Sequence, residues 1–224
     1  MPCTLDYERD LHEQGFCRVA GIDEAGRGPL AGPLLVTGVV FPESLLSSNE
    51  RPRRGAGDLF SNQGFAAQLA GLDDSKKLSS SKREALYEAL KSSRFVESVT
   101  VRIEPQEIDV LNILGATRHG MREVARRLRA DHSLVDGWAV PEFPGPQTAL
   151  VGGDGLSLSI AAASVVAKVE RDRIMFEMAN IYPEYAFERH KGYPTALHLE
   201  RLKKYGPCPI HRRSFGPVAQ IPLL

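Results

Sequence analysis

The sequence predicts an α/β protein with a central mixed sheet of five strands and a helical C-terminal region. Three observations lead to this prediction. A strand-length segment at 17–23 with the apolar run 19–22, and a run rich in Val and Leu at 32–41, are joined by a short glycine-containing turn and are typical of an antiparallel strand pair. Further apolar strand-like runs then alternate with amphipathic helical segments, which is the pattern of a sheet covered by helices. Beyond residue 180 the pattern indicates helices and turns.

Each element rests on a local signal, namely an apolar run of strand length, a helical spacing of apolar residues, or a Ser or Thr whose side-chain oxygen can cap a helix. The helix at 160–178 begins with a run of small residues, so another element can pack closely against it. In chain order we expect a helix over 5–14 ending at Gly15, strands over 17–23 and 32–41, a surface loop over 44–71 with some helical character near 66–69, a helix after Ser79 or Ser80, a strand over 95–103, a helix over 112–129, strands over 133–136 and 149–151, a helix over 160–178, and a helix over 196–205 capped by Thr195.

Composition indicates a soluble globular protein with one domain over 1–224, in which residues from about 180 form a helical appendage. The chain is 42% hydrophobic and 25% charged, as is usual for such proteins. No apolar run has the length of a membrane helix, and residues 1–14 lack the apolar core of a signal peptide. The three cysteines are far apart and have no zinc-binding spacing. We therefore expect a monomeric protein of the reducing cytoplasm, without a membrane partner.

Charge is unevenly distributed along the chain, although the formal net charge is +0. From residue 160 onward there are 10 Lys and Arg residues against 6 Asp and Glu, and the preceding part has 18 against 22. An acidic first part and a basic last part fit a protein that holds metal ions with early acids and phosphates with late cations. A chance imbalance on a solvated surface explains the same numbers equally well.

Four acids lie at strand ends or beside glycine, at Asp23, Glu24, Asp136 and Asp154. Each one alone is more often a turn residue or a helix cap. If their strands are neighbours, the carboxylates converge, and they raise one another's pKa unless a cation neutralises them. Oxygen ligands without His or Cys suit Mg²⁺ or Mn²⁺. Two such ions, about 3.5–4 Å apart, can activate a water and stabilise the leaving oxygen of a phosphodiester.

With these residues identified, the chain resembles a bacterial ribonuclease HII. The matching motifs follow the order of that family over nearly the whole chain: GIDEAGRGPLAGP at 21–33, DSKKLS at 74–79, LVDG at 134–137, GD at 153–154, IAAASVVAKVERD at 160–172 and HKGYPT at 190–195. The resemblance implies an RNase H-like fold. It also implies endonucleolytic cleavage of the RNA strand in RNA/DNA hybrids and cleavage 5′ of a single ribonucleotide in duplex DNA, which initiates ribonucleotide removal. The products would carry 5′-phosphate and 3′-hydroxyl ends.

The resemblance also implies roles for individual residues. The four acids would bind the metal ions. The backbone of Gly26, Arg27 and Gly28 would contact the 2′-hydroxyl, the group that distinguishes RNA from DNA. Tyr193 would pack on the sugar that follows the ribonucleotide, although a core tyrosine is the simpler alternative. The expected phosphate contacts, each of which could also be an ordinary surface residue, are Lys76, Lys77, Ser164, Lys168, Arg212 and Ser214.

The sequence departs from the family pattern in two loops and at one residue. The loops at 47–72 and 137–153 are longer than the family needs, and Trp138 stands where a small or polar residue is expected. The second loop separates two supposed metal ligands, so Asp131 and Asp172 are alternatives to Asp154.

The tail at 220–224 resembles short peptides that dock on bacterial sliding clamps, although an ordinary packed tail is as compatible with five residues. Three other functions remain as alternatives: a ribonuclease HIII, another metal nuclease on the same fold such as a junction resolvase, and a hybrid-binding protein without activity. The glycine spacing excludes a dinucleotide-binding loop, because no helix opens after it.

Overall fold

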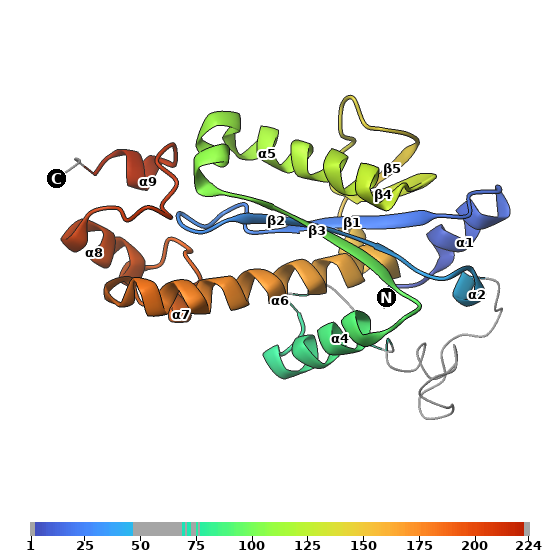
Figure 1. The fold of residues 1–224 in the computed structure, drawn as a ribbon, viewed down its shortest axis with the longest axis horizontal. Helices are drawn as coiled ribbons and strands as arrows, with labels where there is room; N and C mark the ends of the chain where they lie inside the picture. Colours follow the sequence, from blue (N-terminus) through green and yellow to red (C-terminus); the bar gives the residue numbers. More distant parts are fainter. Residues whose placement is uncertain (1–2, 47–68, 70, 73–74, 76, 222–224) are drawn as a thin grey trace.

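The computed structural model describes residues 3–46, 69, 71–72, 75 and 77–221. Within them the chain forms one five-stranded sheet in the order β3-β2-β1-β4-β5 (Figure 1). Strand β1 pairs antiparallel with β2, and β2 pairs antiparallel with β3, whereas β4 runs parallel to both β1 and β5. The predicted mixed sheet is therefore confirmed. The strands are β1 (Val19–Ala25), β2 (Leu34–Val40), β3 (Glu97–Ile103), β4 (His132–Asp136) and β5 (Gln147–Leu150).

Helices cover both faces of the sheet. Helix α5 (Pro105–Leu128) lies on one face, and α6 (Leu158–Ile181) lies on the other with α4 (Ser80–Ser92) beside it. An apolar cluster fills the space on each face. The start of α6 packs unusually close to β1, because a Cβ on Gly21 would lie only 2.3 Å from the backbone nitrogen of Ile160. The small residues at the start of this helix thus serve close packing, as predicted.

The helix on the β3 side differs from its prediction. Helix α5 begins at Pro105 rather than at Asn112, and Asn112 interrupts it with a φ of 55°. The Asn112 side-chain oxygen accepts hydrogen bonds from the backbone N–H groups of Leu114 and Gly115, both at 3.0 Å. Asn112 therefore caps the second segment, which is the part that the apolar spacing predicted. The first segment is too short to show a period.

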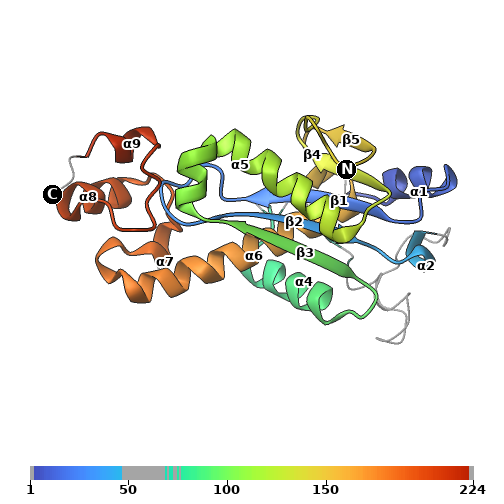
Figure 2. The same ribbon diagram turned by 45° about the horizontal axis from the view of Figure 1, so that its top comes forward.

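The remaining elements that the structure describes are helices of ten residues or fewer. The C-terminal helices follow α6 and pack at its far end, as both ribbon views show (Figures 1 and 2). The caps predicted at Ser79 and Thr195 are confirmed, since each side chain accepts a first-turn N–H. Of the predicted loop at 44–71, most lies outside the described residues, but its start is helical. These elements are α1 (Asp6–Glu13), α2 (Glu43–Leu46), η1 (Gly153–Gly155), η2 (Pro183–Tyr185), α7 (Phe187–His190), α8 (Ala196–Tyr205) and α9 (Gly216–Ala219).

A buried carboxylate links the N-terminal helix α1 to the start of α6. Glu8 of α1 is 1% exposed and accepts hydrogen bonds from the hydroxyls of Ser157 and Ser159, both at 2.6 Å. It also accepts the backbone N–H of Ser159 at 2.9 Å. Glu8 thus satisfies donors at the start of α6. Among the helices of the described residues, none combines the length and apolarity needed to cross a membrane.

Candidate active site

Strand β1 places its two adjacent acids on opposite faces of the sheet. Ile22 belongs to the apolar cluster on the α5 side, and Glu24 shares that face because it is two residues further along the strand. Asp23 points the other way, is 4% exposed, and is hydrogen-bonded to Ser164 of α6. The backbone N–H of Glu24 also donates to Asp23 at 2.7 Å. The alternation of side chains along a strand therefore gives the two acids different surroundings.

The third and fourth acids come from β4 and from the segment after β5. Because β4 runs parallel to β1, Asp136 at its end lies at the same edge of the sheet as Asp23 and Glu24. Asp136 accepts the backbone N–H of Gly153 at 2.7 Å, and this contact holds the short helix that contains Asp154. Asp154 is 8% exposed. Despite the long loop before it, Asp154 is thus fixed next to Asp136.

The two alternative acids are placed elsewhere. Asp131 precedes β4 at the opposite end from Asp136, and it accepts the backbone N–H of Arg18 at 3.0 Å. Asp172 of α6 forms an ion pair with Lys168 at 2.7 Å. Both carboxylates have structural partners of their own, so the geometry favours Asp154 as the fourth acid.

Electrostatic repulsion marks this edge of the sheet. Burial raises the pKa of Asp23 well above its usual range, and the charges of Glu24 and Asp136 raise it further. Hydrogen bonds from Ser164 and from the Glu24 N–H act in the opposite direction. Within the described part of the chain, no three Asp, Glu, His or Cys side chains converge tightly enough to enclose an ion as they stand.

The residues present nevertheless fit a hard divalent cation. The donors are carboxylate oxygens, which Mg²⁺ and Mn²⁺ prefer. A cation beside Asp23 would neutralise the charges of Glu24 and Asp136 that now oppose its ionisation. These three acids and Asp154 are therefore the side chains that would hold such ions.

Hydrogen bonds from the Arg212 side chain fix the glycine loop after β1. This side chain is 0% exposed. Its guanidinium donates to the carbonyl oxygens of Gly26 at 2.6 Å, Arg27 at 3.1 Å and Gly32 at 2.9 Å. This geometry disfavours the predicted phosphate contact of Arg212, because the side chain is buried and engaged with the loop. Its physical role is to fix the backbone that carries Gly26, Arg27 and Gly28.

A second buried arginine supports the same loop. Arg171 of α6 is 1% exposed and donates to the carbonyls of Ala31, Pro33 and Lys191 at 3.0–3.1 Å. Gly26 has a φ of +103°, and a Cβ there would lie 2.2 Å from Arg171 Nε.

Burial lowers the pKa of Arg171 to about 10. Burial and then the Arg171 charge lower the pKa of Arg212 to about 9. Both remain cations at neutral pH, and the ion pairs found among the described residues include neither. No local sequence signal indicates this role of Arg171, because two of its three carbonyl partners lie more than 130 residues away in the chain.

Tyr193 lies beside the glycine loop and is 40% exposed, so it is not a core tyrosine. A Cβ on Gly28 would lie 3.7 Å from the Tyr193 ring. The Tyr193 carbonyl accepts from His198 Nδ1 at 2.9 Å, and His198 Nε2 lies 3.0 Å from His211 Nε2. Because a carbonyl only accepts, Nδ1 of His198 carries the proton and Nε2 accepts from His211. Burial lowers the pKa of His198 to about 4 and of His211 to about 3, so this neutral pair fixes the loop.

The other residues predicted to contact phosphate lie in different surroundings. Lys76 lies outside the described residues. The Lys77 ammonium is 3.8 Å from the position of a Cβ on Gly155, and is therefore near the segment of Asp154. Ser164 is 3% exposed and shares a hydrogen bond of 2.9 Å with Ser75. Ser214 is exposed, and its hydroxyl donates to Asp109 at 2.6 Å.

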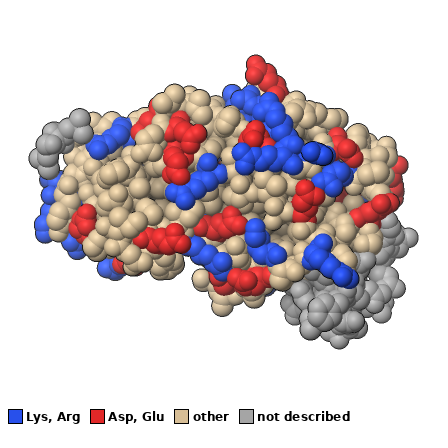
Figure 3. All heavy atoms as spheres, viewed as in Figure 1, with Lys and Arg blue, Asp and Glu red and all other residues tan. Residues whose placement is uncertain are grey.

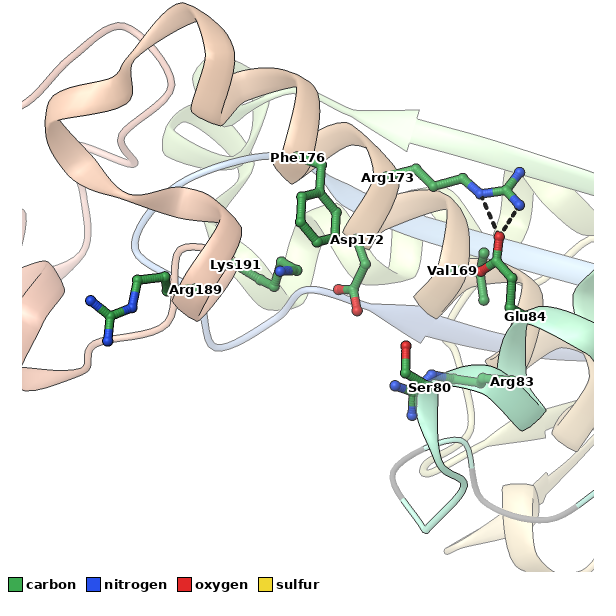
Figure 4. Close-up of a pocket in the computed structure, with 9 residues that line it drawn as sticks. All are labelled: Ser80, Arg83, Glu84, Val169, Asp172, Arg173, Phe176, Arg189 and Lys191. Atoms are coloured by element: carbon green, nitrogen blue, oxygen red, sulfur yellow. Dashed lines mark hydrogen bonds and ion pairs between the residues drawn. The ribbon is translucent and has the colours of Figure 1, made fainter.

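Lys168 pairs with Asp172, which lines a hollow between α4, α6 and α7. Figure 4 shows the carboxylate of its partner Asp172 directed into this hollow and Arg173 joined to Glu84. The Lys191 ammonium lies 3.8 Å from the ring centre of Phe176. An acid at the centre of the hollow disfavours a phosphate there. On the face shown in Figure 3, basic and acidic side chains are interspersed, so that face has no uniform sign of charge.

Comparisons with known proteins agree with this geometry. Residues 59–218 match the family described as Ribonuclease HII. The chain is 44% identical to Ribonuclease HII of Geobacillus kaustophilus over 219 residues, covering 97% of this chain and 75% of that protein. It is 43% identical to Ribonuclease HII of Moorella thermoacetica over 211 residues, covering 93% of this chain and 91% of that protein.

Solved structures show the same fold. The ribonuclease H2 of Pyrococcus horikoshii is 26% identical with a TM-score of 0.65, covering 91% of this chain and 96% of that one. The RNase HII in the PCNA:RNase HII complex from Archaeoglobus fulgidus is 28% identical with a TM-score of 0.64, covering 84% and 88%. Bst-RNase HIII in complex with Mn²⁺ is alike in fold alone, at 14% identity and a TM-score of 0.67, covering 93% and 70%. The chain therefore belongs to the ribonuclease HII family of metal-dependent ribonucleases H, and its sheet and helices form the expected RNase H-like fold.

Proposed function

We propose that this ribonuclease H cleaves the RNA strand of RNA/DNA hybrids and cuts 5′ of single ribonucleotides embedded in duplex DNA, leaving 5′-phosphate and 3′-hydroxyl ends. The observation that carries the proposal is the position of the Gly26–Gly28 backbone and Tyr193. Both lie next to the end of β1, where Asp23 and Glu24 stand. An enzyme that cuts at one ribonucleotide needs a 2′-hydroxyl contact beside its reacting phosphate. A cut 5′ of an embedded ribonucleotide would initiate its removal from DNA.

The proposed function gives the side chains of the site separate roles. Asp23, Glu24, Asp136 and Asp154 would hold two divalent ions, Mg²⁺ or Mn²⁺, which lower the pKa of a water and stabilise the leaving oxygen. Arg212 and Arg171 hold the glycine loop rigid, so that its backbone groups meet the 2′-hydroxyl without rearranging. Tyr193, exposed beside Gly28, is positioned to pack on the sugar that follows.

Cleavage of a DNA duplex with one ribonucleotide, in Mg²⁺ or Mn²⁺, tests the proposal. We expect the wild type to cut 5′ of the ribonucleotide and to leave an all-DNA duplex intact. Asp136→Asn should lose activity to below detection, because it removes a carboxylate from the reacting edge. Asp131→Asn is the matched control at the other end of the same strand, and it should retain activity.

The alternatives give different results in the same assay. Cleavage of long RNA tracts alone would favour the ribonuclease HIII alternative. Binding of hybrids without cleavage in either metal would contradict the enzymatic proposal and leave a binding protein. Cleavage of branched all-DNA junctions would favour a junction resolvase.

The C-terminal tail at 220–224 is our proposed contact for a sliding clamp. An RNase HII is known in complex with PCNA from Archaeoglobus fulgidus, which supports such a partner for the family. Residues 222–224 lie outside the described residues, and Ile221 packs partly against Leu30, Leu202 and Val218. Deletion of 220–224 should abolish binding to a bacterial clamp in a pull-down with purified clamp, and leave cleavage of short duplexes unchanged. Equal clamp binding by the truncated chain would contradict this.

A further inference from the structure

Trp138 is the only tryptophan of the chain, and its side chain is 82% exposed. It stands two residues after Asp136, at the end of β4. A large apolar ring left in water at this position is unusual, because burying such a side chain is favourable. Trp138 is not among the residues that would hold the metal ions or contact the 2′-hydroxyl.

Trp138 lines a hollow of about 240 Å³ that also reaches the acids. Glu24 and Asp136 form the wall at the sheet edge, and Leu114 and Arg118 of α5 form the opposite wall. Leu114 is 45% exposed, so apolar surface lies on two sides of this hollow. The hollow is therefore continuous with the proposed reaction site, on the α5 face of the sheet.

The charges around the hollow indicate what would enter it. Arg27 and Arg118 are both part of its lining. The Arg27 guanidinium lies 3.4 Å from Glu24, whereas the ion pairs found among the described residues include none from Arg118. Apolar surface beside arginine matches a ligand with a ring and an anionic group, which is the chemistry of a nucleotide. An apolar protein segment would instead bury Arg118 and the acids without partners.

Direction along the strand follows from the placement of Tyr193. Tyr193 abuts Gly28 on the loop after β1, and it would contact the sugar after the ribonucleotide. Apart from Arg27, which precedes Gly28 on that loop, the hollow is lined by α5, by Glu24 and Asp136, and by the segment after β4, and Tyr193 is not part of its lining. In an intact duplex the bases remain stacked, so the sugar and phosphate of the preceding nucleotide are the groups that a side chain can reach.

We propose that this hollow binds the nucleotide that precedes the scissile phosphate, with the Trp138 ring packed on its sugar and Arg118 contacting the phosphate on its 5′ side. The proposal rests on the proposed function, because that function places the scissile phosphate at the acids. Trp138 and Arg118 are then specificity-determining residues that hold the strand on the side away from Tyr193.

Tryptophan fluorescence gives a direct test, since the signal comes from Trp138 alone. We expect titration of the metal-free enzyme with a single-ribonucleotide duplex to change the intensity and wavelength of its emission in a saturable way. A duplex that binds, by anisotropy of a labelled strand, without any change in emission would overturn the proposal. This readout does not require cleavage, so it is independent of catalytic competence.

Kinetics of Trp138 variants separate ring packing from a structural effect. Trp138→Ala should lower kcat/KM by roughly 5-fold, mainly through KM, since the apolar face that the ring buries against the sugar would be lost. Trp138→Phe keeps a ring and should restore most of the loss. Phe176→Ala, which removes another exposed ring on α6 outside the hollow, should leave KM unchanged. A Trp138→Ala enzyme with wild-type KM would contradict the proposal.

A truncated substrate tests Arg118. Arg118→Gln should raise KM about tenfold and reduce the salt slope of binding by about 1 on a full-length strand. On a strand that begins at the preceding nucleotide with a 5′-hydroxyl, the phosphate is absent, and the variant should equal the wild type. Arg126→Gln on the same helix is the matched control. An equal loss on both substrates would overturn the phosphate contact.

Failure of the two proposals can be distinguished. If the wild type does not cut single ribonucleotides but cuts longer RNA tracts, the proposed substrate is wrong, and the same variants are compared on those tracts. If the wild type cuts as proposed and the Trp138 and Arg118 variants match it, only the inference about the hollow is wrong.

Discussion

Asp23→Asn is expected to abolish cleavage and, at the same time, to raise the melting temperature of the metal-free protein at neutral pH. Activity is lost because the buried carboxylate between β1 and α6 would no longer bind a cation. Stability rises because burial and the charges of Glu24 and Asp136 all oppose ionisation of Asp23. For a chain of this size, each kcal/mol gained should raise the melting temperature by about 2–4 °C.

The pH dependence of this stabilisation has a definite sign. The pKa of Asp23 is raised in the folded state, so its contribution to stability is fully present below its unfolded pKa and is lost as pH rises through the folded value. The difference in melting temperature between Asp23→Asn and the wild type should therefore be small under acidic conditions and grow towards neutral pH. Thermal unfolding in a chelator, measured over a pH series, checks this directly.

Metal and a control variant complete the test. Mg²⁺ or Mn²⁺ should stabilise the wild type and not the variant, because ligand binding to the folded state adds stability. Asp10→Asn, at an exposed acid of α1, should change neither activity nor melting temperature. An Asp23→Asn protein that is less stable than the wild type in chelator at neutral pH would show that the carboxylate is not under repulsion.

Arg212→Met is expected to lower the free energy of unfolding by about 3–5 kcal/mol and to impair cleavage more than the folded fraction explains. The substitution removes the donor from the buried carbonyls of Gly26 and Gly32 and from the part-buried carbonyl of Arg27, and each buried loss costs about 1–3 kcal/mol. The loop that would meet the 2′-hydroxyl then loses its fixed geometry. Urea unfolding and steady-state kinetics on one preparation measure both effects.

Two further variants show that geometry, rather than charge alone, is responsible. Arg212→Lys keeps the charge, but a lysine ammonium lacks the planar fork that reaches several carbonyls, so we expect an intermediate loss. Arg213→Met, at the exposed neighbour, should change stability by less than about 1 kcal/mol. If Arg212→Met were as stable and active as Arg213→Met, the loop would not depend on this arginine.

Local signals in the sequence determined most of the fold. The apolar runs at β1 and β2 and the caps at Ser79 and Thr195 depend on neighbours within a few residues, so their pattern is visible in one dimension. Asp23, Glu24 and Asp136 could be selected for the same reason, since they stand at strand ends. That the first two face opposite sides of the sheet follows from strand alternation alone.

Only the tertiary structure decided what depends on distant partners. Arg212 bonds to the carbonyl of Gly26, which is 186 residues away in the chain, so the motif could not distinguish a buried support from a phosphate contact. Asp154 lies near Asp136 because the backbone N–H of the adjacent Gly153 donates a hydrogen bond to the Asp136 carboxylate. The hollow at Trp138 exists because α5 lies beside the end of β4. Side-chain hydrogen bonds and cavities join residues that are close only after folding, and no local pattern records them.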